Sequence, residues 1–519
     1  MTRPSGGRRR RLVWAATALV SLALAAAAVV LLTGRQGDVS NPNVSFETAP
    51  PTVPSPPKPK ASRDPFADGF EWPIYGYSKS RTHYLPLARN LRPPFTVRWQ
   101  MRGGVLLEFP PALCGKSLFL LKNNGALVSV SRRTGAIRWR TKLGALAAAS
   151  PACSHGTVYA VLLSRGKGIQ AGRVVAVDAG TGRTRWSRKL PSRAESSPLI
   201  DRGRLYFGSE DGTVYALRAG DGAIRWTYKT GGAVKGGLAL DRGRLYFGDY
   251  GGQVTAIRQA DGSKIWSTGT SGGAFGLRSG QFYATPALAY GRVYIGNTDG
   301  FVYSFGAGDG SLAWRHRTGG YVYSSPAVSP VLGGTVYAGS YDGKLYAFDA
   351  RSGRVRWARN SGGKISGAPV VIGDLVFYSN LGRKSIGAVG AASGKLMWSF
   401  GSGAFNPVIS DGKRLYLNGY STLFMLAEQG RTTDGTLSTT GRRRQRDHLR
   451  AAAQRRHRRY VDRLVAQRRA DLRRILDLRR RHVPVCFVTG GKRVCRVPKP
   501  PVCFQGQGGR TVCRARRTG

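Results

Sequence analysis

Eight positions in the chain share one place in a repeated pattern, three residues ahead of a short apolar run. A proline opens seven of these runs, and Leu238 takes its place in the eighth. The eight residues are Glu108, Ala148, Glu195, Lys235, Tyr283, Tyr323, Ser366 and Ala404. Carboxylates, an amine, phenol rings and a hydroxyl could bind a small polar ligand if the fold brings them together. The candidate ligand residues are Glu108, Glu195, Lys235, Tyr283, Tyr323 and Ser366, and the alternative is a solvated rim without a ligand.

The sequence contains no familiar catalytic or metal-binding motif. HExxH and P-loop patterns are absent, and the six histidines are scattered. We therefore predict no catalytic residue and no metal site. Asp-Gly pairs begin at 211, 221, 261, 299, 309 and 342, but they lack the full acidic spacing of a calcium loop and occur where hairpin turns are needed.

The elements that position these residues are set by a tryptophan repeat. Successive tryptophans are 40, 47, 40, 40, 48, 43 and 41 residues apart. They are Trp99, Trp139, Trp186, Trp226, Trp266, Trp314, Trp357 and Trp398. A period in this range indicates a propeller or another array in which each repeat is one small unit that packs on its neighbours.

Each repeat has the pattern of a four-stranded blade. Residues 204–226 read RLYFGSEDGTVYALRAGDGAIRW, with close copies at 244–266, 292–314 and 335–357. Three β-branched and aromatic runs joined by Gly turns, plus the apolar run ahead of them, give four strands. Residues 95–100 supply a tryptophan strand with no blade before it, while the last repeat lacks one. We predict an all-β, eight-bladed propeller of four-stranded antiparallel blades, closed by sharing a blade between the two ends of residues 95–430.

The repeat resembles a known family. AVDAGTGRTRW at 176–186 matches the AxDxxTGxxxW docking motif of pyrroloquinoline-quinone-like (PQQ-like) propellers, and AFDARSGRVRW at 347–357 matches with Ser352 in place of threonine. The resemblance covers residues 95–430 and implies two branches, quinoprotein dehydrogenases and BamB-like scaffold proteins. It also implies that the eight tryptophans are structural: the motif glycine makes a turn, and each ring packs between blades with its indole N–H on a backbone carbonyl.

The dehydrogenase branch fits less well than the scaffold branch. Those enzymes carry adjacent cysteines over the cofactor and an Asp base beside a calcium site, often on long insertions. This chain has no adjacent cysteines and about 42 residues per blade. We expect a non-catalytic binding or assembly scaffold of the cell envelope with no cofactor. The alternatives are an oxidoreductase using PQQ with calcium, and an envelope sensor that binds a ligand.

The N-terminal residues bear on where in the cell the protein is located. Residues 1–34 hold an Arg cluster and an uncharged stretch, Leu12 to Thr33, long enough to cross a bilayer. By the positive-inside rule we predict a signal anchor with the propeller outside the cytoplasm, a cleavable signal peptide being the alternative. Residues 35–64 are a Pro-rich linker, semi-rigid from Asn41 to Lys60, and 65–94 are a lead-in to the propeller.

The C-terminal region departs from the propeller pattern. After a linker at 431–441, residues 442–482 predict a basic amphipathic helix that Pro484 ends. Residues 483–519 contain two short units, each with glycines between two cysteines. These units predict hairpins bridged by disulfides among Cys486, Cys495, Cys503 and Cys513. Their pairing stays open, and zinc is a weaker alternative. Cys114 and Cys153 are either buried thiols or a further bridge.

Charge bears on the partners. Lysines and arginines exceed acids by 13 − 5 = 8 in residues 1–94, 42 − 17 = 25 in 95–430 and 26 − 5 = 21 in 431–519. So dense a positive tail suits anionic lipids or cell-wall polymers, alongside envelope proteins as partners of the propeller. The predicted compartment argues against nucleic acid. A GC-rich genome, whose codons favour arginine, is the alternative source of part of this charge.

Overall fold

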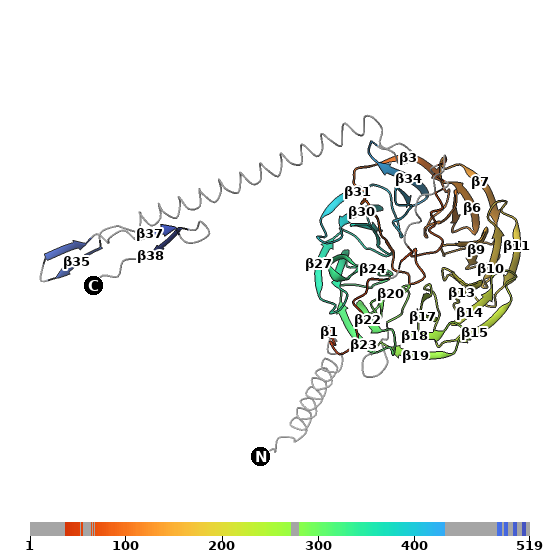
Figure 1. Ribbon diagram of the computed structural model, residues 1–519, viewed down its shortest axis with the longest axis horizontal. Coiled ribbons are helices and arrows are strands. Elements are labelled where there is room, and N and C mark those ends of the chain that lie inside the picture. Colours follow the sequence, from red (N-terminus) through yellow and green to blue (C-terminus); the bar gives the residue numbers. More distant parts are fainter. Residues whose placement is uncertain are drawn as a thin grey trace, which may run out of the picture. The chain divides into compact units, whose positions relative to one another are not determined.

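The computed structural model describes residues 37–51, 53–54, 64, 66, 68–270 and 280–430, together with four strands between 485 and 514. The chain divides into two compact units, Met1–Thr436 and Leu437–Gly519, and the division falls inside the predicted linker. The first unit is a ring of eight antiparallel sheets, which confirms the predicted eight-bladed propeller (Figure 1). Among the described residues the one helical segment is the 3-10 turn Val331–Gly333.

In the first seven blades the strands follow one another from the channel outwards in chain order. The first blade comprises β4 (Ala112–Cys114), β5 (Ser117–Leu121), β6 (Ala126–Ser131) and β7 (Ile137–Lys142), and the second comprises β8 (Ala152–Ser154), β9 (Thr157–Leu162), β10 (Arg173–Asp178) and β11 (Thr184–Lys189). The third comprises β12 (Leu199–Asp201), β13 (Arg204–Gly208), β14 (Thr213–Arg218) and β15 (Ile224–Lys229), and the fourth comprises β16 (Ala239–Asp241), β17 (Arg244–Gly248), β18 (Gln253–Arg258) and β19 (Lys264–Gly269).

The remaining blades complete the ring. They comprise β20 (Ala287–Ala289), β21 (Arg292–Gly296), β22 (Phe301–Gly306) and β23 (Leu312–Arg317); β24 (Ala327–Ser329), β25 (Thr335–Gly339), β26 (Lys344–Asp349) and β27 (Val355–Asn360); β28 (Val370–Ile372), β29 (Leu375–Asn380), β30 (Ser385–Gly390) and β31 (Leu396–Phe400); and β32 (Val408–Ser410), β33 (Arg414–Asn418), β34 (Thr422–Glu428) and the N-terminal strand β3 (Phe95–Arg102).

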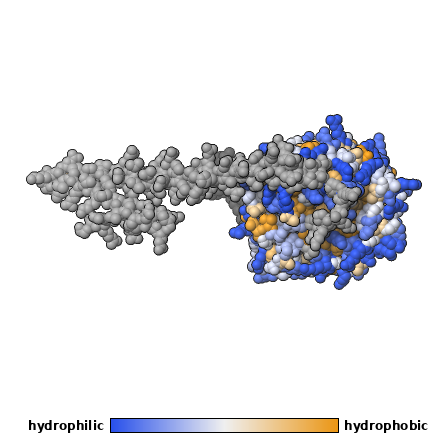
Figure 2. Space-filling model, turned by 45° about the horizontal axis from the view of Figure 1, so that its top comes forward, coloured by the Kyte–Doolittle hydropathy of each residue, from blue (hydrophilic) through white to orange (hydrophobic). Residues whose placement is uncertain are grey.

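Burial within a blade follows strand order. The second and third strands are almost wholly buried, as in β5 and β6, because both of their faces meet neighbouring blades. Outer strands such as β15 alternate exposed and half-buried residues and carry arginine or lysine on the exposed side. Charged outer strands discourage edge-to-edge pairing between molecules. Figure 2 shows the result, a propeller surface dominated by hydrophilic residues with hydrophobic ones in small patches.

The tryptophans join neighbouring blades as the resemblance implied. Seven indole N–H groups donate to a carbonyl of the next blade, for example Trp226 to Gln259 at 3.2 Å and Trp314 to Ala350 at 2.9 Å. The next blade's motif glycine lies flat against each of these rings. A Cβ on Gly262 would come within 2.7 Å of the Trp226 ring, and its φ of +77° also favours glycine.

Trp398 is the exception, and closure of the ring explains it. The eighth blade takes its outer strand from the N-terminal side of the propeller, so it has no motif turn to cover Trp398. Phe95 of β3 packs edge-on against that ring instead, with centroids 5.2 Å apart. The antiparallel pairing of β3 with β34, from Phe95 opposite Glu428 to Arg102 opposite Thr422, confirms the predicted shared blade.

A buried ion cluster locks this closure. We call it the clamp: Asp68, Arg132, Asp411 and Arg414. Arg132 from the first blade lies 2.8 Å from the Asp411 carboxylate of the eighth blade, and Arg414 lies 2.7 Å from the same oxygen. Asp68 from the lead-in adds a contact of 3.0 Å to Arg132. Burial opposes the charge of Asp411, but the two arginines outweigh it and hold the pKa of Asp411 far below its usual range.

The lead-in fills the channel, which the sequence analysis did not predict. Residues 72–85, the plug, follow the inner strands around the axis and end in β2 (Tyr84–Leu85), parallel to β28. Amides of the inner strands donate to the plug: Leu240 to Lys79, Leu288 to Ser80 and Val328 to Thr82, each at 2.8 Å. Figure 1 shows this segment running through the centre of the ring. The backbone carbonyls of the plug can be buried because amides of the blades donate hydrogen bonds to them.

The expected spacer is also partly docked. β1 (Val39–Ser40) pairs with the outer strand β23, and the amide of Arg317 donates to Asp38 at 2.7 Å. Phe46 stacks on Tyr290 with centroids 5.0 Å apart. The segment from 38 to 51 is therefore a strap on the fifth blade and not a free spacer, because its few apolar side chains find a buried site there.

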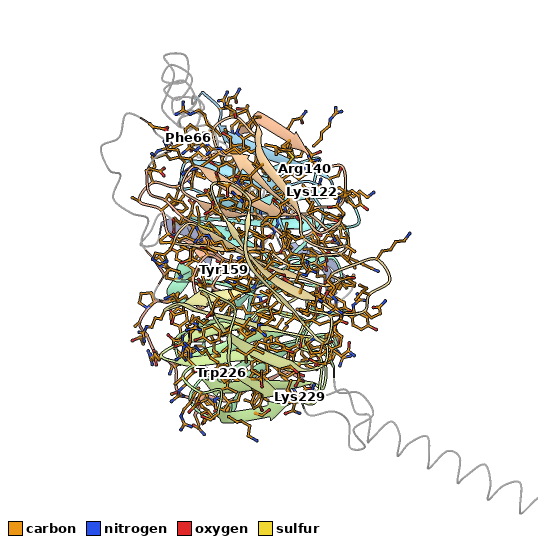
Figure 3. The ribbon with its side chains drawn as sticks, turned by 90° about the vertical axis from the view of Figure 1, so that its right-hand side faces the viewer. Phe66, Lys122, Arg140, Tyr159, Trp226 and Lys229 are labelled. Carbon is orange, nitrogen blue, oxygen red and sulfur yellow. A yellow bond between two sulfur atoms is a disulfide. The ribbon has the colours of Figure 1, made fainter. Side chains whose placement is uncertain are left out.

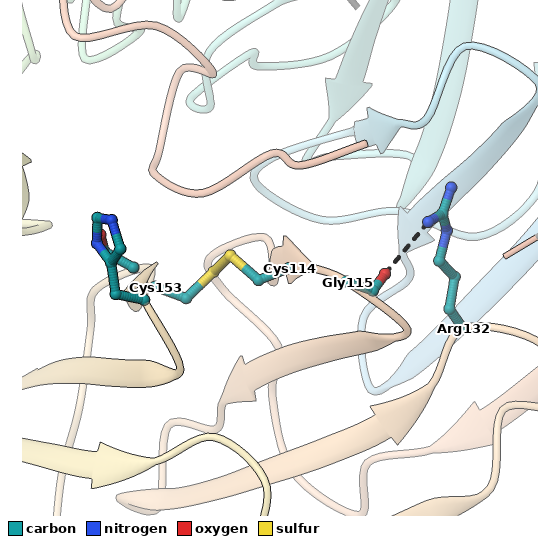
Figure 4. The surroundings of a disulfide bond; sticks show 6 residues. Cys114, Gly115, Arg132 and Cys153 are labelled. Atoms are coloured by element: carbon teal, nitrogen blue, oxygen red, sulfur yellow. Dashed lines mark hydrogen bonds between the residues drawn. A yellow bond between two sulfur atoms is a disulfide. The ribbon is translucent and has the colours of Figure 1, made fainter. Parts of the chain in front are cut away.

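Cys114 and Cys153 form a disulfide between the first two blades, with their Cα atoms 6.5 Å apart. Both residues lie in inner strands, β4 and β8 (Figure 4). The next residue, Gly115, accepts a hydrogen bond from Arg132 of the clamp at 3.2 Å. Of the two alternatives left open by the sequence, the structure has the bridge and not the free thiols.

The second unit contributes two hairpins. β35 (Val485–Thr489) pairs with β36 (Lys492–Arg496), and β37 (Val502–Gln505) pairs with β38 (Thr511–Arg514). The registers place Cys486 opposite Cys495 and Cys503 opposite Cys513, the backbone arrangement that a bridge within each hairpin requires. The disulfides themselves stay a prediction.

The predicted membrane span at 12–33 and the predicted basic helix at 442–482 both lie outside the described residues. Within the part of the chain that the structure describes, no helix is long and apolar enough to cross a bilayer.

Candidate functional site

A cavity of about 230 Å³ occupies the channel above the plug. The structure brings all six candidate residues to its wall, and we call them the mouth ring: Glu108, Glu195, Lys235, Tyr283, Tyr323 and Ser366. The two remaining positions of the pattern, Ala148 and Ala404, are buried and do not line it. Whether the mouth ring binds a ligand stays a prediction.

The residues of the mouth ring come together because each occupies the same position relative to its blade. Each member lies just before an inner strand, so the eight-fold arrangement of those strands directs the side chains towards one axis. The plug closes the same channel from below, with Tyr75 as part of the cavity wall. In the edge-on view of Figure 3, Phe66, which packs on the clamp, and Lys122, at the mouth end of β5, lie towards opposite faces of the propeller.

One side of the cavity is a balanced charge network. The ammonium of Lys235 lies 2.7 Å from Glu195 and 2.8 Å from Glu210, and Arg193 lies 3.2 Å from the other oxygen of Glu210. Burial disfavours the charge on Lys235, but the hydrogen bonds that its ammonium donates to both glutamates outweigh burial and raise the pKa of Lys235 to about 12. Burial also raises the pKa of Glu195, despite the contact with Lys235.

Glu108 stands apart from this network. Its carboxylate accepts one hydrogen bond, from the Asn123 side chain at 2.9 Å, and no cation pairs with it among the described residues. Burial, helped by the charge of Glu195, raises the pKa of Glu108. The cavity therefore holds one carboxylate without a cationic partner.

The other side of the cavity is an arc of tyrosines. Tyr250 and Tyr283 have ring centroids 6.4 Å apart, Tyr283 and Tyr323 5.7 Å, and Tyr323 and Tyr341 4.9 Å. Tyr321, whose exposed fraction is 55%, extends the arc to the surface. Burial, together with the nearby charges of Glu195 and Glu108, raises the pKa of Tyr283 well above its usual value, so its hydroxyl stays protonated.

Several residues that line the cavity or contact the mouth ring escaped the sequence analysis, although a signal for some of them exists. Glu210, Tyr250 and Tyr341 each lie two positions after the glycine that ends a second strand, and Asn123 takes the matching place in the first blade. Each contacts a member of the mouth ring, as Asn123 does with Glu108. Aligning this second position of the repeat would have found them. Tyr75 carries no such signal, because it lies outside the repeats.

The floor of the cavity is held by buried polar residues of the plug. The guanidinium of Arg81 is fully buried and donates only to backbone carbonyls among its described contacts: those of Tyr75, Ser197, Pro198 and Leu238. Burial lowers the pKa of Arg81 to about 9. Tyr75 donates to Asn406 at 3.2 Å, and burial raises the pKa of Tyr75 to about 12. The floor is thus a fixed hydrogen-bonded surface.

The described residues show no arrangement for metal binding. Within them, no three or more His, Cys, Asp or Glu side chains gather as metal ligands would. The aspartates of the pairs at 211, 221, 261, 299, 309 and 342 instead accept hydrogen bonds from the amide two residues on, such as Thr213 to Asp211 at 3.0 Å and Lys344 to Asp342 at 2.9 Å. These side chains stabilise the hairpin turns that the sequence predicted.

Solved structures with the same fold include proteins of both branches. BamB from Moraxella catarrhalis is 18% identical, with 66% of this chain and 99% of that chain covered and a TM-score of 0.53. Quinohemoprotein alcohol dehydrogenase from Comamonas testosteroni is 14% identical, with 73% and 82% covered and a TM-score of 0.58. The computationally designed Ika8 protein is 14% identical, with 63% and 100% covered and a TM-score of 0.51. Identities this low show a shared fold alone.

No curated protein matches the chain. The family described as "Outer membrane protein assembly factor BamB" matches over residues 95–171, 123–271 and 210–433. These overlapping matches extend across every blade and over more than half of the 519 residues. The protein therefore belongs to this family of PQQ-like repeat β-propellers.

Proposed function

We propose that the protein is a non-catalytic binding and assembly scaffold of the cell envelope, anchored by its N-terminal segment with the propeller outside the cytoplasm. The observation that carries this proposal is the plug. Because residues 72–85 fill the channel and bond to the inner strands, what remains is a small cavity at one face and not a deep cofactor site. Outer strands with exposed residues, such as β15, stay available for protein partners.

The donor set of the cavity supports a scaffold over a quinone-dependent oxidoreductase. Pyrroloquinoline quinone is a tricarboxylate, so a site for it needs cations. Among the described residues that line the cavity there is one, Lys235, and two glutamates already contact it. Glu108 and Glu195 would repel a carboxylate placed between them. The residues present do not fit this cofactor, and we derive no redox step from it.

The disulfide supports the proposed compartment. Bonds such as Cys114–Cys153 form and persist in oxidising surroundings outside the cytoplasm. The four tail cysteines agree with the same location. We propose that the uncharged stretch from Leu12 to Thr33 anchors the chain in the cell membrane, and a secreted form after signal cleavage is the alternative.

For the tail we propose contact with anionic lipids or cell-wall polymers. Its net charge of +21 over residues 431–519 favours polyanions, and such attraction weakens as salt screens it. Full-length protein should therefore lose binding to phosphatidylglycerol vesicles steeply between 50 and 300 mM salt, about the range over which screening becomes strong. Absent or salt-independent binding would remove this part of the proposal.

The main test separates scaffold from oxidoreductase. Oxidised full-length protein is titrated by calorimetry with pyrroloquinoline quinone plus calcium, and the mixture is then assayed for dye-linked oxidation of alcohols and sugars. We expect no saturable binding and no turnover. Saturable binding with turnover would overturn the scaffold assignment and identify an unusual active site.

A further inference from the structure

We propose that the cavity binds a compound or side chain bearing an ammonium group, with the Glu108 carboxylate and the tyrosine arc as its receptors. This inference rests on the proposed binding function, because it names the ligand class of the same face. The ligand is defined by its chemistry: one positive charge, surrounded by methyl or methylene groups, on a group small enough for about 230 Å³.

The ring faces of the arc supply the first half of the site. An ammonium over an aromatic face within about 6 Å of the centroid is attracted by the ring quadrupole, and desolvation strengthens the attraction. The protein already uses this contact twice beside the cavity. The ammonium of Lys235 lies 5.3 Å from the Tyr250 centroid, and that of Lys364 lies 5.2 Å from the Tyr341 centroid. Tyr283 and Tyr323, which lie between these two pairs, have no such cation among the described contacts.

The charge balance of the wall supplies the second half. Glu195 and Glu210 are matched by Lys235 and Arg193, so that side of the cavity is neutral as a group. Glu108 is left as the surplus negative charge, and it influences Tyr283 from across the channel. A ligand cation placed between Glu108 and the arc would give this buried carboxylate the partner that it lacks, which is the arrangement that buried charges require.

Competing ligand classes fit the wall less well. An anion would meet the surplus carboxylate inside the cavity, although the propeller as a whole is strongly basic. That basic surface does not exclude a cation, because exposed charges are screened over about 8 Å at physiological salt while the partly buried Glu108 is screened much less. A neutral sugar could stack on tyrosines, but it would draw no benefit from the charge of Glu108. The ammonium is the class that uses both halves.

The same chemistry can come from two sources, a free quaternary or primary amine and a lysine side chain presented by a partner protein. The experiment keeps them apart. Full-length protein is titrated by calorimetry at low salt with choline and, separately, with Nα-acetyl-lysine amide. Each probe has an uncharged match of the same shape: the tert-butyl analogue of choline, and Nα-acetyl-norleucine amide. We expect at least one charged probe to bind and its uncharged match to bind about tenfold more weakly.

Variants locate the site. Glu108→Gln keeps an oxygen for Asn123 and removes the charge, so it should weaken the charged probe about tenfold without lowering the melting temperature. Asp374→Asn is the matched control, an exposed carboxylate outside the cavity that pairs with Arg92, and it should bind like the native protein. If Glu108→Gln unfolds, Tyr323→Leu removes a ring of the arc instead and should weaken binding by a similar factor.

Binding of choline alone would identify a free amine as the ligand source, and binding of the lysine amide would point to a presented side chain. The proposal is wrong if neither charged probe binds, if the uncharged matches bind equally well, or if the cavity variants leave the affinity unchanged. None of these results would touch the scaffold assignment, which fails instead by turnover with the quinone.

Discussion

The clamp and the mouth of the channel treat buried charge in opposite ways. At the closure, Asp411 has two arginines and a tyrosine hydroxyl within 2.8 Å, and its pKa is held far below the usual range. At the mouth, Glu108 has one amide as its partner, and burial raises its pKa. The first arrangement completes every charge with the protein's own groups, whereas the second leaves one charge for something else to complete.

This difference separates structural from functional polar residues without any motif. Both sites combine buried carboxylates with aromatic rings, since Phe66 lies 4.0 Å under Arg414 and tyrosines line the same cavity as Glu108. What distinguishes them is whether the charge is paired within the chain. A paired buried charge is costly to disturb, and an unpaired one at a cavity wall is a candidate for recognition.

The largest effect should come from breaking the clamp. Asp411→Asn keeps the shape of the side chain but leaves Arg132 and Arg414 buried with little countercharge. We expect the free energy of unfolding to fall by about 3–5 kcal/mol, measured by urea denaturation. Asp374→Asn, on an exposed ion pair with Arg92, should change it by less than about 1 kcal/mol. Equal effects of the two variants would mean that the buried clamp contributes no more to stability than an exposed ion pair.

A smaller loss should follow from Arg81→Met, which loosens the plug. The variant leaves the carbonyls of Leu238, Ser197 and Pro198 without a donor, although it also removes a buried charge. We expect a loss of about 2 kcal/mol. The amides of Leu240, Leu288 and Val328, which donate to the plug, should exchange faster with deuterium than in the native protein. Unchanged exchange would mean that the backbone ladder alone holds the plug.

The mouth should tolerate changes that the clamp does not. Replacing Glu195→Gln and Lys235→Met together removes an ion pair while Glu210 keeps Arg193 at 3.2 Å. Because both partners of this largely buried pair are replaced together and neither charge is left alone, we expect less than about 1 kcal/mol of lost stability, by the same urea denaturation. An unfolded double variant would show that the mouth ring is structural, and the ammonium proposal would fall with it.

The smallest effect concerns the pH dependence of stability, and its sign differs between the clamp and the mouth ring. The pKa of Asp411 is lowered on folding, so its contribution is complete above the usual carboxyl range and is lost as the pH falls towards the folded value. The pKa of Glu108 is raised on folding, so its charged form costs stability at neutral pH and stability is regained as the pH falls through the raised value towards 4.5. Unfolding measured from pH 7 to pH 4 should show this gain in the native protein and lose it in Glu108→Gln. A native profile identical to that variant would contradict the assignment.

The sequence predicts the parts of the fold that repeat. Eight blades, the shared closing blade and the mouth ring all follow from aligning tryptophans and prolines, because a repeated position in sequence is a repeated position around the axis. The contact of Trp226 with the Gln259 carbonyl follows from the motif in the same way. Even the missed Tyr250 and Tyr341 occupy one place in the repeat.

What the sequence could not predict lies outside the repeats or joins distant segments. The plug contains Ser78, Arg81 and Thr82, which read as a polar loop and are buried because inner strands more than a hundred residues later satisfy the backbone. Arg132 and Asp411 meet across 279 residues of chain, and no local pattern signals the pair. Which charge at the mouth stays unpaired likewise depends on distances that only the folded ring fixes.

The position of the plug ahead of the blades has a consequence for the order of assembly. Chains emerge from the ribosome N-terminus first, so the plug and β3 exist before any blade does. Several inner strands can then pair with a segment that is already present, as Leu240 and Val328 do with the carbonyls of Lys79 and Thr82. The last strand, β34, must find β3 across more than 300 residues, the longest-range pairing in the ring. The plug is thus synthesised before the blades that surround it, and the pairing of β34 with β3 closes the ring last.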